Sequence, residues 1–201
     1  MSRINRKIIE YMVQEEIISK EDDEYWDYQI EVIEGKILHA LIVIVNTILS
    51  KNSVLFFTYA VCFGALRKNT GGYHASTKNK CTILSILWYC IVNYYLLDAV
   101  KQVNSMYLFL VLGVSIGIIL AYAPVKHPNL LLTVKETKIL RKRSIGILVL
   151  ELGISILLYQ FWRDISATIM LSIISCSFFI TISKLIKQED KVNEGFKEED
   201  T

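Results

Sequence analysis

Six long runs of apolar residues divide this chain, and they constrain its fold more than any other feature. An amphipathic helix of a soluble protein would instead place polar residues along its whole outer face. Four of the runs are about as long as a bilayer-spanning helix, which needs roughly 20 residues. The runs are 37–49, 54–66, 82–100, 106–123, 145–161 and 165–186. The sequence therefore predicts an all-α fold, a polytopic integral membrane helical bundle of about six membrane segments.

The first two runs, 37–49 and 54–66, are shorter than the others. As helices they would each reach only about 20 Å at a rise of about 1.5 Å per residue. The hydrocarbon core of a bilayer is about 30 Å thick. These two segments therefore either thin the bilayer, lean on other helices or form a re-entrant pair, and the sequence leaves the choice open.

The connections between the runs differ in their content of Lys and Arg. Loops 67–81 and 124–144 and the tail 187–201 are basic or contain several basic residues, whereas the alternate connections hold only Lys51, Lys101 and Arg163. Lys and Arg favour the cytoplasmic side of a membrane. We therefore expect a multi-pass protein of the cell membrane with both termini and both basic loops in the cytoplasm.

Composition excludes two other classes of protein. With 53% hydrophobic residues, the chain is too apolar to be disordered over most of its length. Its net charge of +2 is too small for a dedicated nucleic-acid-binding protein, so we expect no nucleic-acid partner.

Residues 1–36 are acidic and lack the basic start and immediate apolar run of a secretory signal. Apolar residues recur at helical spacing there, and Ser19 followed by Asp22 resembles a capping box before a second helix. We expect two amphipathic helices lying at the membrane surface or packed on the bundle. The predicted organisation is this N-terminal region, a transmembrane domain over 37–186 and a charged cytoplasmic tail over 187–201.

Among the four cysteines, Cys81 differs from the rest because it lies between a basic loop and the third apolar run. Cys62, Cys90 and Cys176 lie inside apolar runs and are expected to pack as small hydrophobic side chains. A disulfide is not expected on the reducing cytoplasmic side. The lysines just before Cys81 favour a reactive thiolate.

His74 lies seven residues before Cys81 and follows Gly71 and Gly72. A cysteine protease needs its thiol and its base within hydrogen-bond reach. On one continuous helix residues seven apart are separated by about 10 Å along the axis, so this pair needs a loop. The two glycines permit backbone angles that fold the His74 stretch toward Cys81. Zinc takes about four ligands, and without a second cluster of His or Cys we expect no metal site.

The run from Arg67 through Gly71, Gly72 and His74 to Cys81 resembles the signature of the accessory gene regulator B (AgrB) family. Members of this family are integral membrane cysteine endopeptidases of Gram-positive bacteria. They process the AgrD propeptide into a cyclic autoinducing peptide for quorum sensing. The resemblance extends over about residues 30–186 and includes the Ala-Pro step that opens the second basic loop.

The resemblance implies a role for each motif residue. Cys81 would be the nucleophile, and His74 the general base and then the general acid. Arg67 would fix the loop or substrate carboxylates, and Gly71 and Gly72 would serve its conformation. An internal Cys or Ser of an AgrD-like propeptide would attack the resulting thioester and close a thiolactone or lactone. The resemblance further implies a homodimer in contact with membrane lipids and requires no cofactor.

The basic residues of loop 124–144 have two interpretations. They either enforce topology and contact anionic lipids, or they bind the substrate by steering the acidic C-terminal part of a propeptide. These residues are Lys135, Lys138, Arg141, Lys142 and Arg143.

Two functions without covalent catalysis stay open. A small transporter would need polar residues within the runs, and His39, Asn46, Asn93 and Glu151 are the clear ones. A membrane-anchored accessory scaffold would keep its function when Cys81 is replaced by alanine.

Overall fold

The computed structural model describes residues 3–15, 17–19, 22–73, 78–125 and 133–186 of the 201-residue chain. These residues form helices and connecting turns, without a strand, which confirms the all-α class. The chain divides into two compact units, residues 1–45 and residues 46–201.

Unit 1 holds α1 (Arg3–Gln14) and most of α2 (Asp23–Leu49). Helix α1 is amphipathic: Ile9 is buried, whereas Arg6 and Glu10 are exposed and form an ion pair one turn apart at 3.1 Å. Helix α2 is longer than the apolar run 37–49, because it joins the second expected amphipathic helix to that run without a break. No proline interrupts it, and at Gly35 the helix continues. At 27 residues it is about 40 Å long, enough to cross a bilayer.

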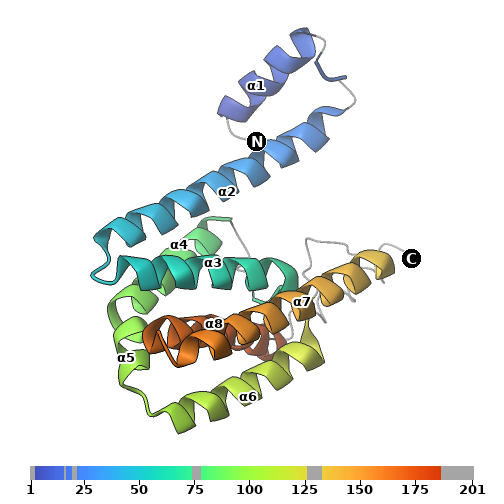
Figure 1. Cartoon of the computed structure of the whole chain (residues 1–201). Coiled ribbons are helices and arrows are strands. Elements are labelled where there is room, and N and C mark those ends of the chain that lie inside the picture. The colour runs from blue at the N-terminus through green and yellow to red at the C-terminus, as the bar shows by residue number, and fades with distance from the viewer. Residues whose placement is uncertain (1–2, 16, 20–21, 74–77, 126–132, 187–201) are drawn as a thin grey trace. The chain divides into compact units, whose positions relative to one another are not determined.

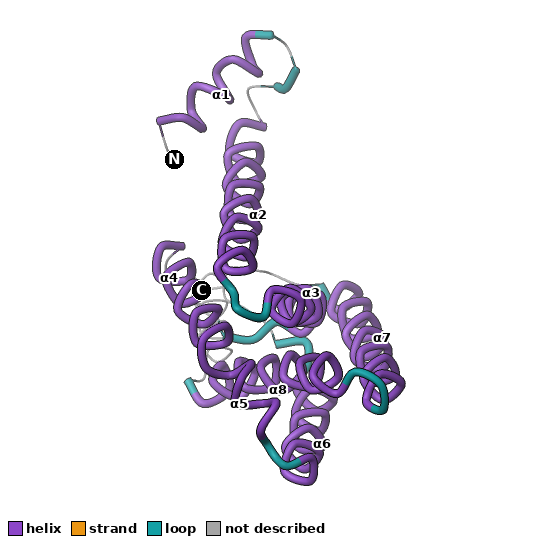
Figure 2. The backbone as a smooth tube through the Cα atoms, turned by 60° about the vertical axis from the view of Figure 1, so that its left-hand side comes forward, coloured by secondary structure: helices purple, strands orange, loops and turns teal. Residues whose placement is uncertain are grey.

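Unit 2 is a helical bundle arranged around one central helix, α8 (Figures 1 and 2). Helix α8 packs against α3, α5, α6 and α7, and most of it is buried. A short π-helical stretch, η2, joins α4 to α5. The elements of this unit are α3 (Ser53–Thr70), α4 (Lys78–Ile91), η2 (Val92–Leu96), α5 (Leu97–Gln102), α6 (Ser105–Tyr122), α7 (Val134–Tyr159) and α8 (Arg163–Leu185).

Small hydroxyl residues allow α8 to take the central position. Inside a membrane the hydrophobic effect does not drive helices together, so small residues that permit close approach favour packing. Ser172 and Ser175 are buried, and their hydroxyls donate to carbonyls of their own helix at 2.7 Å. Ser166 instead donates to the carbonyl of Ser155 on α7, also at 2.7 Å. These three serine hydroxyls are therefore paired within one helix or between two.

Aromatic side chains join α3 and α4 to α8. The Trp88 indole donates a hydrogen bond to the Tyr59 hydroxyl at 2.8 Å. The Trp88 ring also meets the Phe179 ring edge-on at 4.9 Å, and Phe63 lies 5.9 Å from the same ring. Such pairs stabilise packing beyond the area that they bury.

Four helical stretches are long and apolar enough to cross a membrane: Tyr25–Leu49, Asn79–Gln102, Ser105–Tyr122 and Arg163–Leu185. The protein is therefore a membrane protein. Helix α3, which contains the short run 54–66, is not among these four stretches. At its start the Asn52 side chain donates to Asp98 in the first turn of α5 (3.1 Å), and at its end the Thr70 carbonyl accepts from Val125 beyond α6 (2.9 Å). These two bonds tie both ends of α3 to the rest of unit 2.

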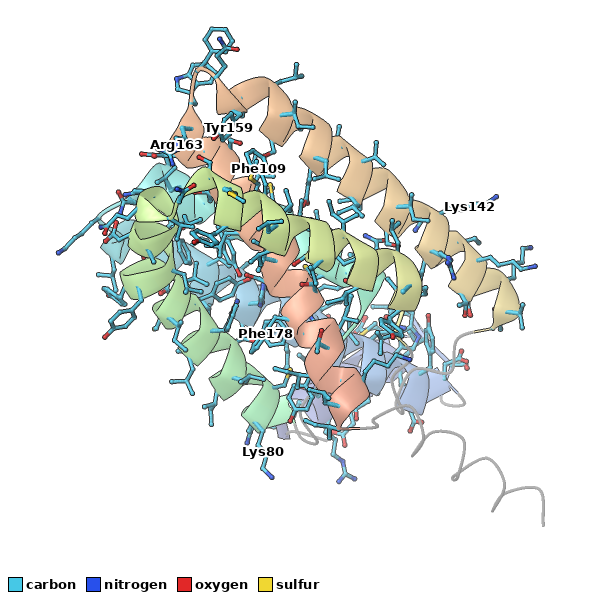
Figure 3. All side chains as sticks on the ribbon, turned by 90° about the horizontal axis from the view of Figure 1, so that it is seen from below. Lys80, Phe109, Lys142, Tyr159, Arg163 and Phe178 are labelled. Atoms are coloured by element: carbon cyan, nitrogen blue, oxygen red, sulfur yellow. The ribbon has the colours of Figure 1, made fainter. Side chains whose placement is uncertain are left out.

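The two ends of unit 2 differ in charge. One end, which we call the basic end, holds Arg67, Lys68, Lys80 and Lys184 together with the first turns of α7. At the opposite end the Tyr159 hydroxyl donates to Ser105 at 2.7 Å and Arg163 donates to the carbonyl of Val103. Figure 3 shows Tyr159, Arg163 and Phe109 gathered at that end, far from Lys80.

A capping box starts α7 at the basic end. The Glu136 backbone N–H donates to the Thr133 hydroxyl oxygen at 3.2 Å, and the Thr133 backbone N–H donates to the Glu136 carboxylate at 2.8 Å. Two hydrogen bonds lower the pKa of Glu136. The bond from the Thr133 backbone N–H has the larger effect, and the bond from the Thr133 hydroxyl adds to it. The cap therefore holds at neutral pH and weakens as the pH falls through this lowered pKa.

We predict that Thr133→Ala frays the start of α7, because the lost cap contributes about 1 kcal/mol. Amide hydrogen exchange over residues 134–138 in detergent should accelerate. Thr137→Ala is the matched control, because the Thr137 hydroxyl donates only to the Thr133 carbonyl (3.0 Å) and caps nothing. Equal exchange in the two variants would contradict the assignment of the cap.

Candidate functional site

Arg67 in the last turn of α3 organises the basic end. Its guanidinium donates from one nitrogen to the carbonyl of Gly71 and from the other to the carbonyl of Tyr73. The guanidinium also lies over the Phe179 ring, 5.1 Å from the ring centre. Arg67 therefore clamps the three loop residues Gly71, Gly72 and Tyr73 against α8.

Both glycines are required where the chain leaves α3. Gly71 has a φ of 66° and Gly72 a φ of 124°, a region that favours glycine. A Cβ on Gly71 would lie 2.5 Å from the carbonyl oxygen of Val125, and one on Gly72 would overlap the Arg67 guanidinium. The loop can approach its neighbours this closely only without side chains at these positions.

Two backbone hydrogen bonds fix the loop to other elements. The Tyr73 N–H donates to the Phe179 carbonyl on α8 at 3.0 Å, and the Val125 N–H donates to the Thr70 carbonyl at 2.9 Å. Val125 is buried and lies at the start of the second basic loop. The first loop is therefore held by α8 on one side and by the beginning of the second loop on the other.

Cys81 lies in the first turn of α4, half-buried, and its thiol is free. The Ser85 hydroxyl donates to its carbonyl at 3.0 Å. The Arg67 guanidinium interacts electrostatically with the thiol of Cys81 and with that of Cys176. The structure thus brings Arg67, both motif glycines and Cys81 to the basic end.

His74 falls within residues 74–77, outside the described part of the chain, and so does its distance from Cys81. The residue immediately before it, Tyr73, is bonded through both its N–H and its carbonyl. The backbone that leads into His74 is therefore fixed at its last described residue.

The other cysteines pack within the bundle. Cys176 is buried with its sulfur 3.8 Å from the carbonyl oxygen of Phe63. Cys90 is half-buried with its sulfur 3.9 Å from the side-chain oxygen of Asn46, and Cys62 is half-buried in α3. Within the described residues, no group of three or more His, Cys, Asp and Glu side chains could hold a metal ion.

The polar residues of the apolar runs fall into separate helix contacts. Asn93 donates to the backbone carbonyl of Asn46 at 3.2 Å, which joins η2 to the end of α2. Ser172 of α8 lies 3.4 Å from the Glu151 carboxylate on α7. Hydrogen bonds of this kind hold membrane helices together. In both pairs one side-chain oxygen, Oδ1 of Asn93 and Oε1 of Glu151, is buried without a hydrogen-bond partner among the described residues.

The basic residues of the second loop extend from the first turns of α7. All five, Lys135, Lys138, Arg141, Lys142 and Arg143, are exposed. Arg141 also donates to the Leu120 carbonyl at the end of α6, at 3.2 Å. Lys142 points away from the bundle in Figure 3. Arg141 therefore has a structural role that the other four need not share.

Fold and site together define a polytopic membrane protein with an arginine-clamped Gly-Gly loop and a half-buried cysteine at the same end of its bundle. The chain matches the family model for Accessory gene regulator B over residues 5–183, most of its length. It therefore belongs to the AgrB family, a family of peptidase-like processing proteins. Membership is consistent with processing of an AgrD-type substrate in quorum sensing. No curated protein and no solved structure shows significant similarity to the chain.

We predict that Gly72→Ala displaces the loop, because the new methyl group overlaps Arg67 and forces an unfavourable φ that costs about 1–3 kcal/mol. Amide exchange over residues 71–73 should accelerate and the Tm in detergent should fall. Gly64→Ala on α3 is the matched control, since nothing lies within 4 Å of its Cβ, and it should stabilise the helix by about 0.5–1 kcal/mol. A Gly72→Ala variant as protected as wild type would refute the clamp geometry.

Proposed function

We propose that this protein is a membrane cysteine endopeptidase that cleaves the C-terminal part of an AgrD-like propeptide. Cys81 is the nucleophile, and His74 is the general base and acid. The observation that supports this most is the Arg67 clamp, because it fixes the residues directly before His74 at the end of the bundle that carries Cys81. Membership in the AgrB family supports the same substrate class.

The reaction proceeds in two acyl transfers. His74 accepts the thiol proton as the Cys81 sulfur attacks the scissile carbonyl, and it then returns that proton to the leaving amine. The C–N bond breaks, the C-terminal fragment leaves, and a thioester remains on Cys81. A Cys thiol or Ser hydroxyl within the precursor next attacks the thioester carbonyl. The Cys81 thiol is regenerated with the proton of that group, and the product is a thiolactone or lactone. No cofactor is needed, because the thioester conserves the acyl group for transfer.

Three features of this chain serve that chemistry. Cys81 lies in the first turn of α4, at the positive end of that helix. The Arg67 guanidinium interacts electrostatically with the same side chain. The loop backbone is fixed before the substrate arrives, which lowers the entropic cost of aligning His74 with Cys81. Arg67, Gly71 and Gly72 are thus positioning residues and take no part in bond exchange.

The basic end faces the cytoplasm in this proposal. Its excess of Lys and Arg over the opposite end follows the positive-inside rule. Both termini are then cytoplasmic, residues 1–36 form a cytoplasmic and interfacial region from which α2 continues into the membrane, and residues 187–201 form a cytoplasmic tail. The protein acts as a homodimer in the cell membrane of a Gram-positive bacterium, with lipids around the domain 37–186.

The exposed basic residues of α7 bind the acidic part of the propeptide. The second basic loop begins at Val125, which is bonded to the end of α3 beside Gly71. A peptide held on this loop therefore lies close to the first loop. Opposite charges raise the rate of such an encounter in a salt-dependent way.

The first prediction of this proposal concerns the nucleophile. Purified protein in lipid should cleave its precursor at one site and release a product lighter by one water than the linear fragment, as detected by mass spectrometry. Cys81→Ala and His74→Ala should abolish cleavage, whereas Cys62→Ala and Cys90→Ala should retain it. Cleavage that survives in Cys81→Ala would overturn the mechanism and favour a transporter or scaffold.

A second prediction concerns the charges of α7. Combined replacement of Lys138, Lys142 and Arg143 by Gln should raise the KM for an acidic precursor on the order of tenfold at low salt, with kcat unchanged. Arg141 is spared because it bonds to α6. Lys51→Gln at the opposite end is the control and should leave KM unchanged. If the triple variant keeps its KM, these residues serve only topology and lipid contact.

A further inference from the structure

The ring of Phe179 on α8 packs against the guanidinium of Arg67. Its ring lies 5.1 Å from the Arg67 guanidinium carbon and is only 7% exposed. Within the described residues no carboxylate forms an ion pair with Arg67. The aromatic face therefore supplies the attractive surface on which the guanidinium rests, and such a contact is strongest when it is shielded from water.

The backbone of Phe179 holds the loop itself. Its carbonyl accepts the hydrogen bond from the Tyr73 N–H at 3.0 Å. Gly72 packs against the same carbonyl, since a Cβ on Gly72 would lie 3.2 Å from the Phe179 carbonyl carbon. One residue of α8 thus touches the clamp through its ring and the clamped loop through its backbone.

The ring of Phe179 also meets the helix that carries Cys81. Trp88 contacts it edge-on at 4.9 Å. Trp88 lies seven residues after Cys81, which is about two helical turns, so both side chains project from the same face of α4. The face of α4 that carries Cys81 is therefore the face that packs toward Phe179.

From these contacts we infer that Phe179 is a positioning residue that sets the loop before His74 against the face of α4 that carries Cys81. It acts through Arg67, Tyr73 and Trp88 and touches no reacting atom. This inference rests on the proposed function for its catalytic consequence, whereas its structural consequence can be measured without any substrate.

The chain offers a matched control at the neighbouring position. Phe178 also stacks on Trp88, at 5.5 Å, and meets the Phe179 ring edge-on at 5.7 Å, but it is half-exposed and makes no ring contact with Arg67. Phe178→Leu therefore removes the same volume from the same helix and leaves the ring over Arg67 in place. Phe179→Leu and Phe179→Met remove the aromatic face, and Phe179→Tyr keeps it.

We expect Phe179→Leu and Phe179→Met to lower kcat for precursor cleavage by about 5- to 30-fold, the effect of losing a shielded cation–π contact, with little change in KM. Amide exchange over residues 71–73 should accelerate in the same variants. Phe178→Leu should match wild type in both measurements, and Phe179→Tyr should restore both. A role in packing alone would lower the Tm of all the leucine variants and would not separate kcat from KM.

Two results would overturn the inference: wild-type kcat in Phe179→Leu and Phe179→Met, or loop exchange equal to that of Phe178→Leu. If Phe179→Leu does not fold, Phe179→Met decides in the same way, and Phe179→Tyr serves as the variant that keeps the aromatic face. Failure of the proposed function is distinguishable, because wild type would then show no Cys81-dependent cleavage. In that case the exchange data still decide whether Phe179 anchors the loop.

Discussion

The Arg67 guanidinium lies where α3 leaves the apolar part of the bundle, and the whole basic end depends on how its charge is satisfied there. A buried cation without partners is costly, and so are buried loop carbonyls without donors. Here the two needs meet, because the guanidinium donates to the carbonyls of Gly71 and Tyr73. The absence of side chains on Gly71 and Gly72 makes this approach possible. Helix end, loop and arginine are therefore stable only as a set.

The central helix follows from a similar balance. Buried serines of α8 return their hydroxyls to nearby carbonyls, so a helix with many polar side chains can lie in the middle of an apolar bundle. Their small size brings neighbouring helices close. Where α8 approaches the basic end, the large rings of Phe178 and Phe179 lie between the buried serines Ser177 and Ser183. There aromatic contacts add to the close helix packing, and the loop backbone bonds to Phe179.

Sequence patterns predicted the class of fold, and they singled out Arg67, Gly71, Gly72 and Cys81, which the structure places at one end of the bundle. Apolar runs of membrane length are a strong signal, and the spacing from Arg67 to Cys81 is specific. The length of α2 could not be predicted, because a change from amphipathic to fully apolar pattern does not end a helix and no proline marks a boundary. The roles of Phe179 and Val125 could not be predicted for another reason. Each lies within or beside an apolar run, and each acts through a ring face or a backbone group that leaves no pattern in the sequence.

The bond between the Val125 N–H and the Thr70 carbonyl ties the two basic loops into one mechanical unit. Val125 anchors the start of the second loop, and its carbonyl oxygen lies against Gly71. A change in the backbone of one loop at this point therefore also changes the geometry of the other. An exchange of loops between family members would succeed only where the register of residues 123–125 against the end of α3 is carried over as well.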